Sequence, residues 1–162
     1  MYSKKSFTPD QAFQKIKQFC AYQERSHREV TEKLYSFGLY KKEVEQLIGQ
    51  LLEENYLNEE RFAIAFAGGK FRIKQWGRVK IKYELKQKGV SALCISIALK
   101  EIEEETYLAT LKSVATKKWE SLKGEQYLNR QAKTTTYLLQ KGFEPQLITS
   151  VLADIRRGSM PY

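Results

Sequence analysis

The sequence predicts an all-α protein built from three tandem three-helix repeats, stacked into an elongated, curved molecule. Apolar residues recur at intervals of three or four, and no segment keeps the alternating period of a strand. Glycine and proline are sparse, at nine and three of 162 residues. A pattern of about fifty residues also recurs along the chain. A compact globule of nine helices is the alternative architecture.

The repeat is organised by three glycines, Gly38, Gly89 and Gly142, which are 51 and 53 residues apart. Each follows a leucine by four positions and precedes apolar residues at six, ten and thirteen positions. These apolar positions are Leu34, Val44, Ile48 and Leu51, then Leu85, Ile95, Leu99 and Ile102, then Leu138, Ile148, Leu152 and Ile155. Because glycine accepts a positive φ at the end of a helix, each glycine is predicted to end one helix of its repeat.

Helix-start signals agree with this organisation. Thr8 before Pro9 predicts the first helix, and Ser26 with Glu29 forms a capping box for the second. Asn58, Ser91 and Glu144 before Pro145 mark further starts. The predicted helices span residues 9–23, 26–37, 41–54, 58–75, 77–88, 91–104, 106–122, 125–141 and 144–156. The repeats are then residues 1–57, 58–104 and 105–157, followed by a flexible tail at 158–162.

Residues 70–89, termed here the basic segment, carry eight Lys or Arg and one acid. Their net charge is +7, against +9 for the whole chain, and Phe71, Trp76 and Tyr83 are interleaved with them. Such a concentration of charge is typical of a surface that binds a polyanion or an acidic protein. A solvated basic face is the alternative. The main candidate contacts are Lys70, Lys74, Arg78, Lys82 and Lys86, and the secondary ones are Arg72, Lys80, Lys88, Arg25 and Arg28.

The helical pattern also predicts which way this segment faces. Phe62, Phe66 and Ile73 form one line along the 58–75 helix and are expected in the core. Trp76, at the junction with the next helix, is expected to be a core residue rather than a base-stacking platform.

On the 77–88 helix, Ile81 and Leu85 point inward, beside a row formed by Arg78, Lys82 and Lys86. Val79 and Tyr83 form a second apolar pair on the opposite side of that helix. They either pack on a neighbouring repeat or meet a partner. The third repeat adds basic residues at Lys117, Lys118, Lys123, Arg130, Lys133 and Lys141.

The residue composition does not favour an enzyme. His27 is the only histidine, and the two aspartates, Asp10 and Asp154, lie near opposite ends. No phosphate-binding glycine loop is present, so no catalytic residue, metal or cofactor is predicted. Cys20 and Cys94 are expected as buried thiols in a reducing cytoplasm. No secretory leader is expected before them, because the basic start of the sequence has no apolar run after it, and no apolar run approaches the roughly 20 residues that span a bilayer.

Three segments carry a resemblance to a known family, namely residues 25–34 (RSHREVTEKL), 56–63 (YLNEERFA) and 76–90 (WGRVKIKYELKQKGV). In this order they resemble the first, second and third motifs of the RecX regulatory proteins. The likeness covers residues 20–104 in the right order and spacing, and the third repeat fits by its helix pattern. Gly68 and Gly69 depart from the family and weaken their helix by about 1 kcal/mol each relative to alanine, so a bend is expected there.

The resemblance implies a non-enzymatic regulator of the RecA recombinase that acts in DNA recombination, DNA repair and the SOS response. It implies a crescent of three-helix repeats that binds in the groove of the RecA–single-stranded DNA filament and restrains ATP hydrolysis, strand exchange and co-protease activity. The expected partners are the RecA filament and single-stranded DNA, directly or through the filament. A monomeric, cytoplasmic protein without membrane contact is expected. A stand-alone basic DNA-binding helical module is the alternative.

Overall fold

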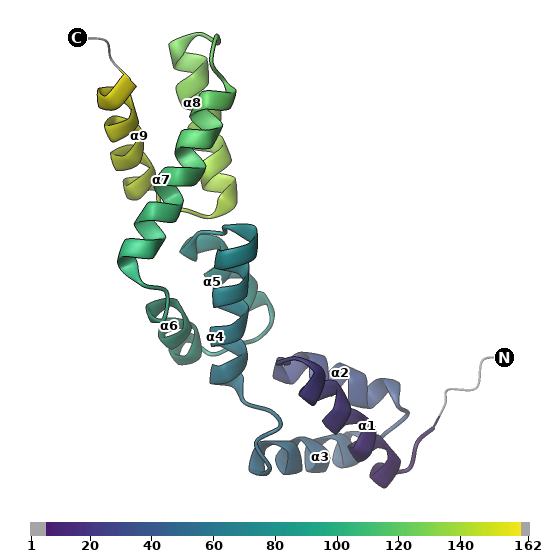
Figure 1. Cartoon of the computed structure of the whole chain (residues 1–162). Helices are drawn as coiled ribbons and strands as arrows, with labels where there is room; N and C mark the ends of the chain where they lie inside the picture. Colours follow the sequence, from purple (N-terminus) through teal and green to yellow (C-terminus); the bar gives the residue numbers. More distant parts are fainter. Residues whose placement is uncertain (1–5, 160–162) are drawn as a thin grey trace, which may run out of the picture. The chain divides into compact units, whose positions relative to one another are not determined.

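The computed structural model describes residues 6–159, and these contain helices but no strand (Figure 1). The helices are α1 (Pro9–Tyr22), α2 (His27–Ser36), α3 (Lys41–Glu53), α4 (Glu59–Gly69), α5 (Arg78–Gln87), α6 (Ala92–Lys100), α7 (Glu104–Ser121), α8 (Tyr127–Lys141) and α9 (Pro145–Ser159), with a π-helical turn at Lys70–Lys74. The prediction of an all-α fold made of helical repeats is confirmed.

The helices form two compact units. The first unit comprises the chain up to Ala65 together with Leu85–Ile97. The second comprises Phe66–Glu84 together with the residues from Ala98 onward. The division between the units therefore passes through α4, α5 and α6.

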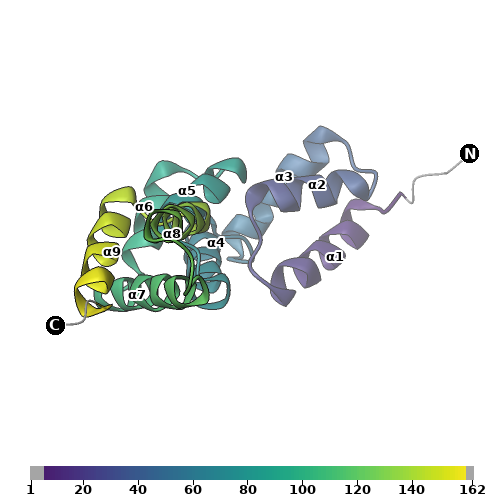
Figure 2. The ribbon, with the colours of Figure 1, turned by 90° about the horizontal axis from the view of Figure 1, so that it is seen from above.

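In the first unit, α1, α2 and α3 pack against one another around an apolar core (Figure 2). Ile16, Leu34 and Leu51, one from each helix, are fully buried in that core. The predicted caps are confirmed, because the side chains of Thr8 and Ser26 each accept a hydrogen bond from the third residue of the helix that follows. These caps satisfy backbone donors that the first helical turn leaves without partners.

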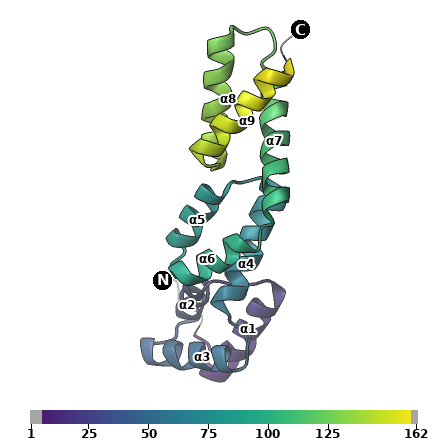
Figure 3. The ribbon, with the colours of Figure 1, turned by 90° about the vertical axis from the view of Figure 1, so that its left-hand side faces the viewer.

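In the second unit, α7, α8 and α9 lie side by side and each packs on the other two (Figures 1 and 3). Trp119, Leu138 and Ile148 supply fully buried side chains to this packing. An aromatic series adds to the core, with the Tyr107 ring centroid 5.7 Å from that of Phe71 and 5.6 Å from that of Phe143. The series ties the π-helical turn to α7 and to the start of α9.

The three repeat glycines adopt the backbone that the sequence predicts. Gly38, Gly89 and Gly142 have φ of 85°, 78° and 94°, in the region that side chains disfavour. Position 142 requires glycine for a second reason, since a Cβ there would collide with the Cβ and backbone nitrogen of Lys80. The Val79 amide donates to the Gly142 carbonyl at 2.9 Å, so two backbones meet at this point.

Most predicted helix boundaries are correct within two residues. The ends of the fourth, sixth and ninth helices differ by more than two. The sixth helix ends at Lys100 rather than at residue 104, because α7 begins at Glu104, two residues before its predicted start. Glu104 and Glu105 then lie in the first turn of α7, where carboxylates suit the helix dipole. Helix α9 continues to Ser159, so residues 158 and 159 of the predicted tail are helical, and residues 160–162 lie outside the described part.

The predicted core line of the 58–75 helix is wrong at Ile73, which is 79% exposed. Phe71 is buried instead. The cause is the π-helical turn after Gly69, which takes more residues per turn than an α-helix and rotates the later side chains away from the original face. Gln75 then ends the turn with a left-handed backbone, φ 56°. The helix thus departs from α geometry directly after the two adjacent glycines.

Three findings among the described residues concern membranes, metal ligands and the two cysteines. No described helix is long and apolar enough to cross a membrane. No group of three or more potential metal ligands gathers among residues 6–159. Both cysteines are free, but only Cys20 is buried, whereas Cys94 is half-buried at the surface of α6. Burial raises the pKa of the Cys20 thiol above its usual value.

Candidate functional site

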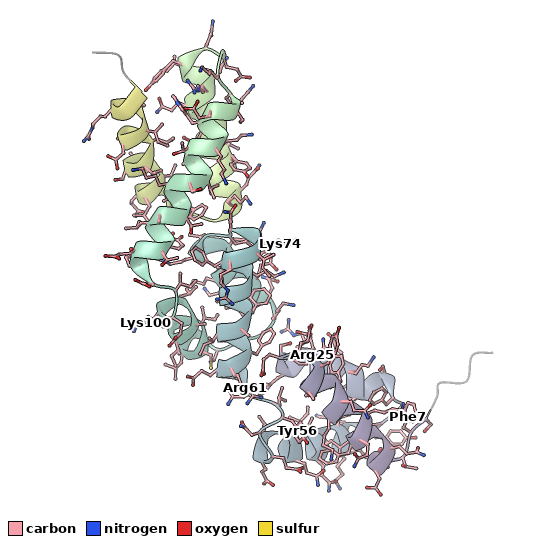
Figure 4. The ribbon with its side chains drawn as sticks, in the orientation of Figure 1. Phe7, Arg25, Tyr56, Arg61, Lys74 and Lys100 are labelled. Atoms are coloured by element: carbon pink, nitrogen blue, oxygen red, sulfur yellow. The ribbon has the colours of Figure 1, made fainter. Side chains whose placement is uncertain are left out.

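The structure divides the basic segment into exposed and engaged side chains. Arg72, Lys74, Lys82 and Lys86 are exposed, and no carboxylate of residues 6–159 pairs with them. The π-helical turn presents Arg72 and Lys74, and α5 presents the two others. Lys74 lies at the far end of the helical run that begins with α4 (Figure 4). These four cations are the available charge of the segment.

Helix α5 combines this charge with exposed apolar surface. Val79 and Tyr83 are 51% and 58% exposed, so the alternative in which a neighbouring repeat covers them does not hold. They share one side of α5 with Lys82 and Lys86 at helical spacings of three, four and seven residues. We call these four residues the α5 outer face. Ile81 and Leu85 are fully buried on the other side, as the pattern predicts.

Trp76 is half-buried with two lysines over its ring, rather than enclosed in the core. The Nζ atom of Lys80 is 4.4 Å from its ring centroid, and that of Lys70 is 5.1 Å away. The Phe66 ring meets the half-buried indole edge-on at 6.5 Å. A cation over an indole is attracted by the negative face of the ring. The two lysines therefore retain their charge but are held in position by the chain's own aromatic surface.

Arg78 forms ion pairs and a ring contact within the second unit. Its guanidinium pairs with Glu104 at 2.5 Å and Glu144 at 3.1 Å, and it stacks on the Tyr107 ring at 3.7 Å. The Tyr107 hydroxyl donates to Glu144 and accepts from the Arg78 amide. Burial, and next this bond to a carboxylate, raise the pKa of Tyr107. We name this group the Arg78 network; it joins α5 to α7 and α9.

The two candidates from the first repeat are also engaged. Arg25 donates from Nε to the Phe19 carbonyl at 3.0 Å, and its guanidinium carbon lies 3.7 Å from the centre of the Phe19 ring. Arg28 donates to the Gln87 carbonyl, and its guanidinium lies against Gly89. Lys88, the remaining candidate, is half-buried. Within the first unit these arginines fasten segments together, so their charge is less available than that of the exposed lysines.

The second family-like motif has a structural role that its residues did not reveal. Arg61 pairs with Glu24 at 2.5 Å and donates to the carbonyls of Asn55 and Tyr56, while Asn58 caps α4. Figure 4 labels Arg61 at the start of α4 and Tyr56 in the loop before it. The motif thus holds the α3–α4 loop to the end of α1.

A basic and aromatic cluster in the third repeat was not among the predicted site residues. Helix α8 places Lys133, Tyr137 and Lys141 one turn apart, and Lys118 of α7 lies 4.8 Å from the centre of the Tyr137 ring. Spacings of four and eight residues could have indicated a shared face. The sequence could not indicate that α7 adds a cation to the same ring.

Comparisons with known proteins agree with this architecture. Residues 58–99 match the family model for the second three-helix domain of RecX, and residues 104–152 match the model for the third. The regulatory protein RecX of Prosthecochloris aestuarii is 33% identical over 132 residues, which cover 82% of this chain and 85% of that protein.

The chain belongs to the RecX family. The regulatory protein RecX of Bacillus cytotoxicus is 26% identical, and the aligned part spans 85% of this chain but about half (51%) of that longer relative. The crystal structure of RecX from Lactobacillus salivarius superimposes with a TM-score of 0.83 at 22% identity, over 91% of this chain and 96% of that one. A second RecX crystal structure gives 0.81 at 20% identity, covering 90% and 71% of the two chains. These two structures support the fold.

Proposed function

We propose that this RecX-family protein binds the RecA–single-stranded DNA filament and restrains RecA's ATP hydrolysis, strand exchange and co-protease activity. Membership of the family, with 33% identity across most of a regulatory protein RecX, is the observation that carries the proposal. The relatives are named as regulators, and we assign this chain no catalytic residue. Action in the cytoplasm as a monomer belongs to the same proposal.

The α5 outer face and the exposed cations before it are the proposed contact surface. A filament of protein on DNA offers both phosphates and protein side chains, and this surface has groups for both. Lys82 and Lys86 attract anions, while Val79 and Tyr83 add apolar area that phosphates would not need. Aromatic and basic side chains in combination are typical of residues that dominate binding energy at interfaces.

An ATPase titration tests the proposal. The protein is added to the cognate RecA on single-stranded DNA, and ATP hydrolysis is expected to fall as its concentration rises. The double variant Lys82→Glu, Lys86→Glu reverses two exposed charges and is expected to raise the half-inhibiting concentration roughly tenfold, from about 0.7 kcal/mol per contact.

The matched control is Lys42→Glu, Lys112→Glu, which makes the same change of net charge at exposed, unpaired lysines of α3 and α7. It should inhibit like the parent protein, since neither lysine belongs to the proposed surface. Absence of inhibition by the parent would refute the function. Equal behaviour of the two double variants would refute the surface.

A second function, binding of bare DNA without RecA, is favoured by the two lysines that lie over the Trp76 ring. Single-strand binding through phosphates weakens with salt, with a slope of about −0.7 per contact. Salt-resistant binding to RecA in the absence of DNA supports the filament regulator. Binding to DNA with a steep salt slope and no binding to RecA supports the DNA-binding module.

A further inference from the structure

A shallow groove of about 340 Å³ runs between α7 and α8 in the second unit. Its lining residues are Lys118 from α7 and Ala132, Lys133, Thr136, Tyr137 and Gln140 from α8. None of them is acidic. Such a volume is at the lower end of the range for small-ligand sites. The groove belongs wholly to the third repeat and shares no residue with the basic segment.

Tyr137 is the aromatic residue that lines the groove. It is half-buried, with the Lys118 Nζ atom 4.8 Å and the Lys141 Nζ atom 5.8 Å from its centroid. Two ammonium groups thus lie within 6 Å of the centre of one aromatic ring that borders an open groove. The Thr136 hydroxyl and the Gln140 amide, both on exposed residues, add groups that can donate and accept hydrogen bonds.

The lysines that line the groove, and Lys141 beside it, differ in how far the protein neutralises their charge. Lys133 pairs with Glu125 at 2.6 Å. Lys141 donates to the Lys74 carbonyl at 2.9 Å, a neutral acceptor that leaves its charge in place. Lys118 has no carboxylate partner among residues 6–159. Two uncompensated cations therefore remain beside the ring.

We propose that this groove binds one nucleotide of a single-stranded polynucleotide, with the base stacked on Tyr137 and its phosphate paired with Lys118. An aromatic ring takes any base through its face, and adjacent lysines follow the backbone. An acidic peptide would use the two cations but gain little from the ring. The proposal deepens the proposed function and rests on it, because it gives the third repeat a direct contact with the filament's DNA.

Fluorescence anisotropy of a short labelled oligothymidylate, at low salt and without RecA, tests the groove. Tyr137→Ala is expected to weaken binding roughly tenfold, since stacking on one aromatic residue is removed. Tyr137→Phe keeps the ring and should bind like the parent. Circular dichroism of both variants identifies any loss of folding, and the salt slope of Lys118→Gln keeps the test decisive if the alanine variant unfolds.

Lys118→Gln supplies a readout that packing alone would not change. The slope of the logarithm of affinity against the logarithm of salt should become shallower by about 0.7, the amount for one phosphate contact on a single strand. Lys112→Gln, at an exposed and unpaired position on the same helix, should leave that slope unchanged. An unchanged slope for Lys118→Gln overturns the proposal.

Competition separates the two classes of polyanion. If poly-glutamate displaces the oligothymidylate equally well and Tyr137→Ala has no effect, the groove binds an acidic protein segment and the proposal fails. No binding of the oligothymidylate by the parent also overturns it. A parent that inhibits RecA while Tyr137→Ala binds oligothymidylate normally refutes the groove alone. A parent that binds through Tyr137 without inhibiting RecA refutes the proposed function alone.

Discussion

Replacing Arg78 by alanine is expected to destabilise the second unit by about 3 kcal/mol. A charge-assisted hydrogen bond to the half-buried Glu144 is worth about 1.5–3 kcal/mol. The pair with Glu104 adds less than about 1 kcal/mol, because that carboxylate is 63% exposed. Stacking on Tyr107 adds about 1 kcal/mol. Since these contributions share one side chain and are not additive, about 2–4 kcal/mol is the expected range.

Tryptophan fluorescence during urea unfolding is the suitable measurement. Trp76 and Trp119, the chain's two tryptophans, both lie in the second unit, so their emission follows the unit that contains the Arg78 network. In a thermal scan the same loss should lower the midpoint by about 6–12 °C, from roughly 2–4 °C per kcal/mol at this chain length.

Two further variants control the measurement. Lys82→Ala removes an exposed, unpaired cation from the same helix and should change the free energy of unfolding by less than about 0.5 kcal/mol. Arg78→Lys keeps the charge but not the planar fork that reaches two carboxylates, so an intermediate loss is expected. The reasoning is refuted if Arg78→Ala unfolds within 0.5 kcal/mol of the parent.

Two other predictions concern the close approach at Gly142 and the buried tyrosine. Gly142→Ala should lower the free energy of unfolding in urea by at least about 3 kcal/mol, because its Cβ collides with Lys80 and a left-handed backbone costs a further 1–2 kcal/mol. Gly124→Ala, with φ 99° and open space around its Cβ, should lose only the backbone part. Equal losses in the two variants would contradict the collision. Tyr107 has a folded pKa above its unfolded value of about 10, so its contribution is complete below that pH and is lost as pH rises further. Tyr107→Phe should therefore show a weaker fall of stability above pH 10 than the parent, and parallel pH curves would count against a raised pKa.

Sequence patterns were reliable wherever the interaction was local. Capping by Ser26, the positive φ of Gly38 and the inward side of α5 each depend on residues within one or two turns. The same reasoning failed at Ile73, because the π-helical turn changes the period on which the pattern relies. It also placed Trp76 in the core, since periodicity does not indicate that two lysines will lie over its ring.

The basic segment shows most clearly which features the sequence reveals and which depend on tertiary contacts. Its eight cations were evident from the sequence, and so was its likeness to the RecX family. Which of them are available was not, because availability depends on residues far along the chain. Arg78, for example, pairs with Glu144, which lies 66 positions away along the chain.

By itself, therefore, the sequence determined the helices, most of their ends, the repeat and the family, since these rest on short-range backbone preferences and on the period of the apolar residues. Only the tertiary structure decided which charges are compensated and which stay open to a partner. Ion pairs and cation–π contacts form across elements at a few ångströms, and a linear pattern contains no information about those distances.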